Sequence, residues 1–111
     1  MGEDKIHKFL DKLLGNLAYG IESGRSSVLE CLFQVITQFP ERLLSSKSTL
    51  FFSALCAAFS GDESLALRER SGELIQLLVK KYPNEDYFKV SIDIIKMIVN
   101  NFLAYVKIHQ K

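Results

Sequence analysis

The chain contains two apolar segments that resemble each other and lie 43 residues apart. Leu29-Glu30-Cys31-Leu32-Phe33-Gln34-Val35 aligns with Gly72-Glu73-Leu74-Ile75-Gln76-Leu77-Leu78, and Phe39-Pro40 aligns with Tyr82-Pro83. Self-similarity at a period of about 40 residues is typical of proteins that stack copies of one helical unit. We therefore expect the chain to repeat a single structural unit.

Apolar residues recur at spacings of three and four along five segments, which predicts five amphipathic α-helices. The helices are expected at about residues 4–18, 28–39, 50–59, 65–82 and 88–108. No Asn-Gly or Asp-Gly hairpin signal occurs, and no segment alternates with period two for long. The predicted fold class is therefore all-α.

Turn and capping residues separate these helices. Gly20 and Gly24 are assigned to the first connection, and Pro40 closes the second helix. The polar cluster from Ser45 to Thr49 offers N-caps for the third helix, and Asn84 can cap the fifth. The first, third and fifth helices then begin about 40 residues apart, which is the length of one helix-pair unit.

The fifth helix has an unusually wide apolar surface. Its polar residues fall in one narrow stripe, namely Lys89, Asp93, Lys96, Asn100 and Lys107. A terminal unit of a repeat protein normally needs a polar outer face. We therefore expect residues 1–111 to form a single α-helical repeat domain that is a fragment or short isoform of a longer protein, or whose last helix a partner covers.

The second helix pair resembles the HEAT consensus at one specific place. Asp62 stands in the turn between its helices, and Leu67-Arg68 follows in the next helix. An aspartate there can accept from backbone N–H groups and offer its other oxygen to an arginine, so Asp62 and Arg68 are the predicted repeat-stabilising residues. An ordinary N-cap with a solvated arginine is the alternative. The resemblance implies an α-solenoid of HEAT-like antiparallel helix pairs, with about two and a half repeats.

Catalytic, cofactor and metal sites are not expected. His7 and His109 stand near opposite ends of the chain, and Cys31 and Cys56 lie in apolar helical surroundings without metal-ligand spacing. The chain is therefore expected not to be an enzyme. A small helical enzyme or cofactor binder is a further alternative, and it would need a polar-lined pocket between the helix pairs.

Nucleic-acid and membrane contacts are also restricted by composition. The chain has 14 basic and 13 acidic side chains, so it lacks the excess positive charge that drives general phosphate binding. Its longest apolar run, Leu50 to Phe59, is about half the ~20 residues that a membrane span requires. We expect no membrane association and no small-molecule substrate.

Local basic clusters are the candidate contacts for RNA or an acidic partner. They comprise Arg68, Arg70, Lys80, Lys81, Lys89 and Lys96. Clusters of this kind are more often solvated helix faces, which is the alternative for each of them.

Residues 14–83 also resemble part of the very large HEAT-repeat scaffold of the small-subunit processome, the down-regulated-in-metastasis family. The residues that carry this likeness are Asn16-Leu17-Ala18-Tyr19, Glu22-Ser23-Gly24-Arg25, Leu29-Glu30-Cys31-Leu32, Phe39-Pro40 and the turn from Asp62 to Arg68. The resemblance implies a non-catalytic scaffold in the nucleus and nucleolus that supports processing of small-subunit pre-rRNA. Its partners would be proteins of a large ribonucleoprotein assembly, with local pre-rRNA or small nucleolar RNA contact. The alternative is a HEAT-type adaptor in transport or phosphatase scaffolding.

Overall fold

The structure, a computed structural model, describes residues 2–110, which form helices joined by short loops, with no strand among them. Residues 1 and 111 of the expected domain lie outside it. The helices are α1 (Glu3–Gly15), α2 (Glu22–Gln38), α3 (Glu41–Leu44), α4 (Ser48–Gly61), α5 (Leu65–Lys81) and α6 (Asp86–His109), with 3₁₀ turns at Asn16–Ala18 and Ser45–Lys47. The predicted all-α class is confirmed.

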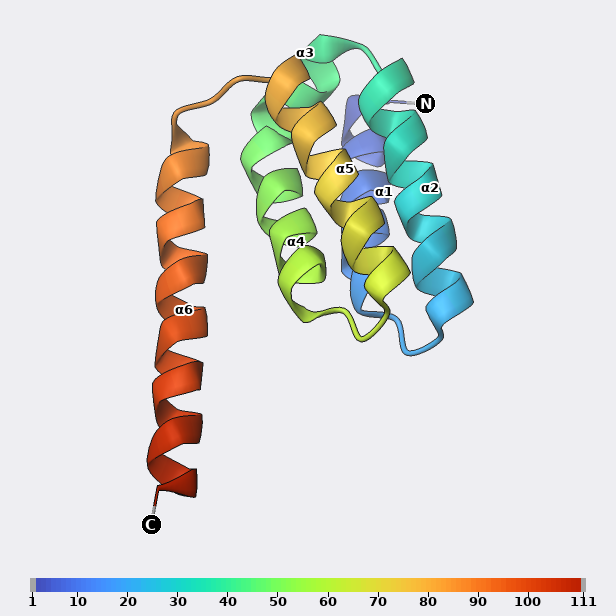
Figure 1. Cartoon of the computed structure of the whole chain (residues 1–111). Coiled ribbons are helices and arrows are strands. Elements are labelled where there is room, and N and C mark those ends of the chain that lie inside the picture. Colours follow the sequence, from blue (N-terminus) through green and yellow to red (C-terminus); the bar gives the residue numbers. More distant parts are fainter. Residues whose placement is uncertain (1, 111) are drawn as a thin grey trace.

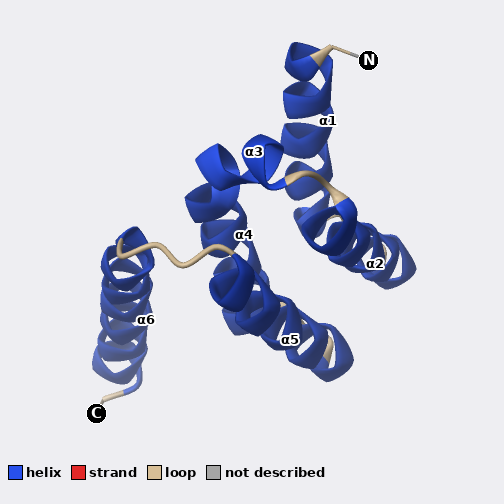
Figure 2. Cartoon of the chain, turned by 90° about the horizontal axis from the view of Figure 1, so that it is seen from above, coloured by secondary structure: helices blue, strands red, loops and turns tan. Residues whose placement is uncertain are grey.

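The long helices lie in two rows. Figure 2 shows α1, α4 and α6 along one row, and α2 and α5 along the other. The helices of the first row run in one direction and those of the second row run in the opposite direction (Figure 1). α5 packs against both α4 and α2, so it joins the two rows and the two helix pairs.

Leucine and aromatic side chains fill the space between α1, α2, α4 and α5. The buried core consists of Leu10, Leu13, Leu14, Leu29, Leu32, Val35, Ile36, Leu44, Phe51, Phe52, Leu55, Leu67, Leu74, Leu78, Tyr82 and Tyr87. All of them except Tyr82 and Tyr87 lie in helices α1 to α5. Burial of apolar area on this scale is the main term that stabilises the fold.

The second helix begins earlier than its apolar pattern predicts. α2 starts at Glu22, so Gly24 lies inside the helix rather than in the connection, and that expectation was wrong. A Cβ atom at position 24 would lie 2.5 Å from Cδ1 of Tyr19. The glycine is therefore needed because the ring of Tyr19 packs directly on the helix backbone.

The polar cluster Ser45–Thr49 does not cap α4, which is the third of the helices expected from the sequence, and that expectation was wrong. Ser45–Lys47 forms a 3₁₀ turn after α3, and the Ser48 hydroxyl donates to the carbonyl of Ser45 instead of capping α4. Leu43 and Leu44 in α3 are buried, which pulls this segment onto the core. The N-cap residue of α6 is Glu85, which makes no side-chain cap hydrogen bond, and not Asn84 as expected from the sequence. Asn84 lies one residue earlier and accepts from the backbone N–H of Asp86 at 2.9 Å.

Taken as one 21-residue stretch, Glu41–Gly61 is long and apolar enough to cross a membrane by length and composition alone. This stretch is longer than the apolar run considered from the sequence, because the helical segments before Ser48 continue into α4. Core helices of globular proteins meet the same criterion, and Leu44, Phe51 and Leu55 of this stretch are buried in the core.

α6 is attached mainly through its first turns. The ring of Tyr87 stacks on Phe52 with centroids 4.5 Å apart, and the Tyr87 hydroxyl donates to the carbonyl of Tyr82 at 2.6 Å. From Ile95 to the end of the helix every side chain is exposed. Figure 1 shows this part of α6 extending past the end of α4. The wide apolar surface expected for this helix is therefore exposed.

Candidate functional site

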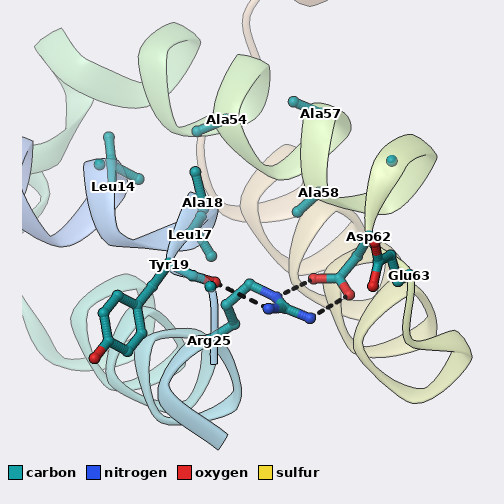
Figure 3. A pocket seen from close by; sticks show the side chains of 13 residues that line it. Leu14, Leu17, Ala18, Tyr19, Arg25, Ala54, Ala57, Ala58, Asp62 and Glu63 are labelled. Carbon is teal, nitrogen blue, oxygen red and sulfur yellow. Dashed lines mark hydrogen bonds and ion pairs between the residues drawn. The ribbon is translucent and has the colours of Figure 1, made fainter. Parts of the chain in front are cut away.

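The first polar link between the two helix pairs joins α2 to the turn before α5. Arg25 Nε donates to Asp62 Oδ2 at 2.9 Å, and Arg25 Nη2 donates to Asp62 Oδ1 at 3.1 Å (Figure 3). The side chains are only 14% and 4% exposed. A bidentate pair of this kind fixes geometry as well as charge, because both carboxylate oxygens are held.

The two ends of this pair are also held locally. Arg25 Nη1 donates to the carbonyl of Tyr19 at 2.9 Å, and the backbone N–H of Ser64 donates to Asp62 Oδ1 at 2.9 Å. Ser64 in turn caps α5 by accepting from the backbone N–H of Leu67. The turn of the second pair is thereby joined to the first pair through one guanidinium group.

The electrostatics of this link follow from the same contacts. The hydrogen bond from Arg25 lowers the pKa of the Asp62 carboxyl, with a smaller opposing effect of burial and a further lowering by the Ser64 N–H. The hydrogen bond to Asp62 raises the pKa of Arg25. Both groups are therefore held in their charged forms.

Arg68 does not bind Asp62 as the sequence predicted. The Asp62 carboxylate takes Arg25 from the preceding helix pair, while Nε of Arg68 is buried and has no hydrogen-bond partner in the described residues. Arg68 lowers the pKa of Asp62 only weakly, through its charge. The expectation that Asp62 bonds a backbone N–H in its own turn agrees with the contact to Ser64.

A second link joins the middles of α2 and α5. Arg70 donates to both Glu30 oxygens, from Nε at 2.9 Å and from Nη2 at 3.2 Å, and to Glu73 at 2.8 Å. Its guanidinium lies 4.8 Å from the centroid of the Phe33 ring. The hydrogen bonds to Glu30 and then Glu73 raise the pKa of Arg70.

A third link joins the last turns of the same two helices. Lys81 Nζ donates to the carbonyls of Ile36 at 2.6 Å and Thr37 at 3.3 Å. A cation is favourable there because the terminal carbonyls of a helix carry partial negative charge. We call these three links, made by Arg25, Arg70 and Lys81, the polar seam.

The six basic residues expected to contact partners therefore divide into groups. Arg70 and Lys81 are engaged inside the molecule in the polar seam. Lys80, Lys89 and Lys96 are exposed, and Arg68 is half-buried. Arg70 and Arg25 were not recognised as links between helix pairs from the sequence, because their partners lie 40 and 37 residues away. The 43-residue repeat does mark Arg25 as a second candidate for the role predicted for Arg68, because it aligns the two arginines.

An open cavity of about 600 Å³ lies above the first link, between the ends of α1 and α4. Its walls are mostly small or aliphatic: Leu14, Gly15, Leu17, Ala18, Gly20, Ala54, Ala57, Ala58 and Gly61. Its charged lining residues are Arg25, Asp62 and Glu63, and Figure 3 shows the first two bound to each other. The cavity therefore offers apolar contact more than free polar groups.

The histidines and cysteines lie apart from this region. His109 lies near the end of α6, its Nδ1 2.9 Å from the carbonyl of Tyr105, and His7 lies in α1. Cys31 and Cys56 are half-buried free thiols, and burial raises the pKa of Cys56. Within residues 2–110, no group of three or more potential metal ligands comes together.

Comparison with known proteins gives two relatives. No family model matches the chain, and no solved structure matches it. The chain is 33% identical over 86 residues, 78% of its length, to U3 small nucleolar RNA-associated protein 20 of Schizosaccharomyces pombe. It is 35% identical over 82 residues, 74% of its length, to the protein of the same name in Saccharomyces cerevisiae. The chain spans about 3% of the length of these relatives.

Proposed function

We propose that this chain is a non-catalytic structural scaffold of a ribosome-biogenesis complex, the small-subunit processome, and that it supports processing of small-subunit pre-rRNA. The observation that carries the proposal is the similarity to U3 small nucleolar RNA-associated protein 20 of two yeasts over about three quarters of the chain. The chain would act in the nucleus and nucleolus, as a HEAT-like solenoid segment within a large assembly of proteins and RNA.

The arrangement of the helices supports a scaffold of this kind. Two antiparallel helix pairs stack side by side, and the polar seam holds α2 and α5 in a defined relation. Units that contact only their neighbours form extended surfaces, which are suited to holding partners.

Exposed lysines are the proposed local contacts to RNA. Lys80 lies at the end of α5, and Lys89 and Lys96 lie one above the other along α6. The near-neutral charge of the chain gives no general attraction to RNA, so these contacts would add to binding through proteins. Arg68 differs from the lysines, because its Nε atom is buried.

The proposal is tested by affinity purification of the tagged natural protein from nuclear extract, with and without ribonuclease. We expect U3 small nucleolar RNA to be enriched in the untreated sample, together with proteins required for small-subunit rRNA processing. Purification of the Lys80→Glu, Lys89→Glu, Lys96→Glu triple variant is expected to recover less of the RNA. Recovery of protein partners alone, unchanged by ribonuclease and without U3 RNA, would instead favour an adaptor in another pathway.

A further inference from the structure

One apolar stripe of α6 has the spacing of a helix that pairs with another helix along a seam. Its residues follow one another at alternate steps of four and three, and they are Phe88, Ile92, Ile95, Val99, Phe102 and Val106. Such steps define the a and d positions of a heptad repeat. Phe88 is 73% exposed and Phe102 is 62% exposed, so the stripe is open near both of its ends.

The stripe lies on a different side of α6 from the contact with α4. Tyr87 marks that contact by stacking on Phe52, and Ile94 is half-buried on the same side two turns later. At about 100° per residue, the stripe is centred roughly 110° from Tyr87 and Ile94 around the helix axis. Figure 2 shows α6 at the end of its row, with α4 as its neighbour there. The stripe can therefore pack on a further helix while α6 keeps its contact with α4.

The stripe is complementary to a second copy of itself in antiparallel orientation. When Ile95 of one helix lies opposite Val99 of the other, every layer joins two unlike residues. The remaining layers are Ile92 with Phe102 and Phe88 with Val106. Each phenylalanine then faces a smaller aliphatic side chain, and large groups facing small ones can interdigitate closely. In parallel orientation each phenylalanine would face its own copy instead.

The charges at the two ends of α6 favour the same orientation. Asp86 lies in the first turn of the helix, and Lys107 and His109 lie in the last turn. Antiparallel pairing brings the acidic start of each helix beside the basic end of the other, and it also opposes the two helix dipoles. Parallel pairing would gather like charges at both ends.

The exposed area of the stripe is enough for a small interface. Ile95 is 58% exposed, Val99 47% and Val106 43%. A fully exposed aromatic side chain offers roughly 150–250 Å² and an aliphatic one somewhat less, so the stripe offers about 500 Å² on each chain. A pair of chains would bury about 1,000 Å², which is near the lower limit of specific interfaces. Pairing of this size is weak and depends on concentration.

We propose that two copies of this chain pair through α6 in antiparallel orientation and bury the stripe between them. The contact is isologous, because the same surface of both copies takes part and a two-fold axis exchanges them. It therefore closes at two chains. In dilute samples the single chain predominates, so residues 95–109 stay accessible there and become covered only in the fraction of chains that are paired.

The first test measures the mass of the full chain by sedimentation over a wide range of concentration. We expect the mass to rise from that of one chain, 12.6 kDa, toward twice that value. Phe102→Glu should weaken pairing by roughly ten-fold or more, because a charge would be buried in the interface. The matched control is Met97→Glu, which should leave pairing unchanged. Met97 is 52% exposed and lies opposite the stripe around the helix axis.

A distance between spin labels tests the orientation. The labels are attached to Ile108→Cys, a position that is 77% exposed, in a chain that also carries Cys31→Ala and Cys56→Ala. At a rise of 1.5 Å per residue, the two labelled positions of an antiparallel pair lie about 30 Å apart along the helix axis. A parallel pair would place them side by side. Circular dichroism establishes that each variant is folded.

Several results would overturn the proposal. A single-chain mass at every concentration would do so, as would pairing that Phe102→Glu leaves unchanged. Labels that lie side by side would exclude the antiparallel orientation, and a mass beyond two chains would exclude a contact that closes. These measurements involve no RNA and no other protein, so a failure here is distinguishable from a failure of the proposed function.

Discussion

At the scale of single residues, one ion pair sets the relation between the two helix pairs. Arg25 and Asp62 are nearly buried and bind through both carboxylate oxygens. Exposed ion pairs contribute little to stability, but removal of one partner from a buried pair leaves the other without compensation. The pair is therefore expected to matter more than the exposed ion pair between Arg42 of α3 and Glu3 of α1.

Asp62→Asn should lower the melting temperature by roughly 4–8 °C in this small domain, because the amide keeps the size of the carboxylate and removes its charge. The measurement is thermal denaturation followed by circular dichroism at neutral pH. Asp93→Asn is the control, since Asp93 is exposed on α6 and makes no hydrogen bond within residues 2–110. Equal melting temperatures for Asp62→Asn and the unchanged chain would show that the pair does not stabilise the fold.

The same pair predicts a dependence on pH. The pKa of Asp62 is lower in the folded chain than in the unfolded chain, chiefly because of Arg25. Its stabilisation is therefore fully present above the unfolded pKa of about 4 and is lost as the pH falls through the folded pKa. The difference in melting temperature between the unchanged chain and Asp62→Asn should stay constant from pH 7 to about pH 5 and shrink below about pH 4. A difference that grows in acid would contradict this assignment.

At the scale of elements, the first turns of α2 pack closely against the ring of Tyr19 at Gly24. Gly24→Ala should be destabilising by about 1 kcal/mol or more even though alanine favours helices, because its Cβ would overlap the Tyr19 ring. Gly61→Ala, at a position where a Cβ meets no atom within 4 Å, should be neutral or stabilising. Chemical denaturation of both variants provides the measurement.

A second variant separates the contact with Tyr19 from any other effect at position 24. In a Tyr19→Ala background the ring is absent, so Gly24→Ala should become stabilising by about 0.4–1 kcal/mol. If it remains destabilising there, the ring does not explain the glycine.

The helices were predictable from the sequence. Several helix boundaries, such as the start of α2, and the pairing of Arg25 with Asp62 were not. Spacings of three and four residues identify the five long helices because each buries one side. The sequence predicts a turn at Gly24, because the contact of this residue with Tyr19 is tertiary and leaves no local pattern. The partner of Asp62 was missed for a similar reason: Arg68 is near in sequence, whereas Arg25 reaches the turn only after the two pairs have packed together.

At the scale of the whole molecule, the fold is well packed up to the first turns of α6 and exposed beyond them. Segments with few buried contacts open with low free energy. In hydrogen–deuterium exchange, the amides of residues 95–109 should therefore exchange much faster than those in the middle of α4 and α5. Protection of residues 95–109 equal to that of α4 would mean that the exposed surface of α6 is covered in solution, by self-association or by a different packing.

Two apolar positions that lie 43 residues apart differ in burial: Ile36 of α2 is completely buried, whereas Val79 of α5 is 38% exposed. The most direct test is methyl NMR of the full chain with an inert paramagnetic agent dissolved in the solvent, which broadens signals according to their exposure. We expect strong broadening at Val79, intermediate broadening at Ile75, and almost none at Leu32 and Ile36, in the order of their exposure. Equal protection of Ile36 and Val79, or stronger broadening at Ile36, would contradict it.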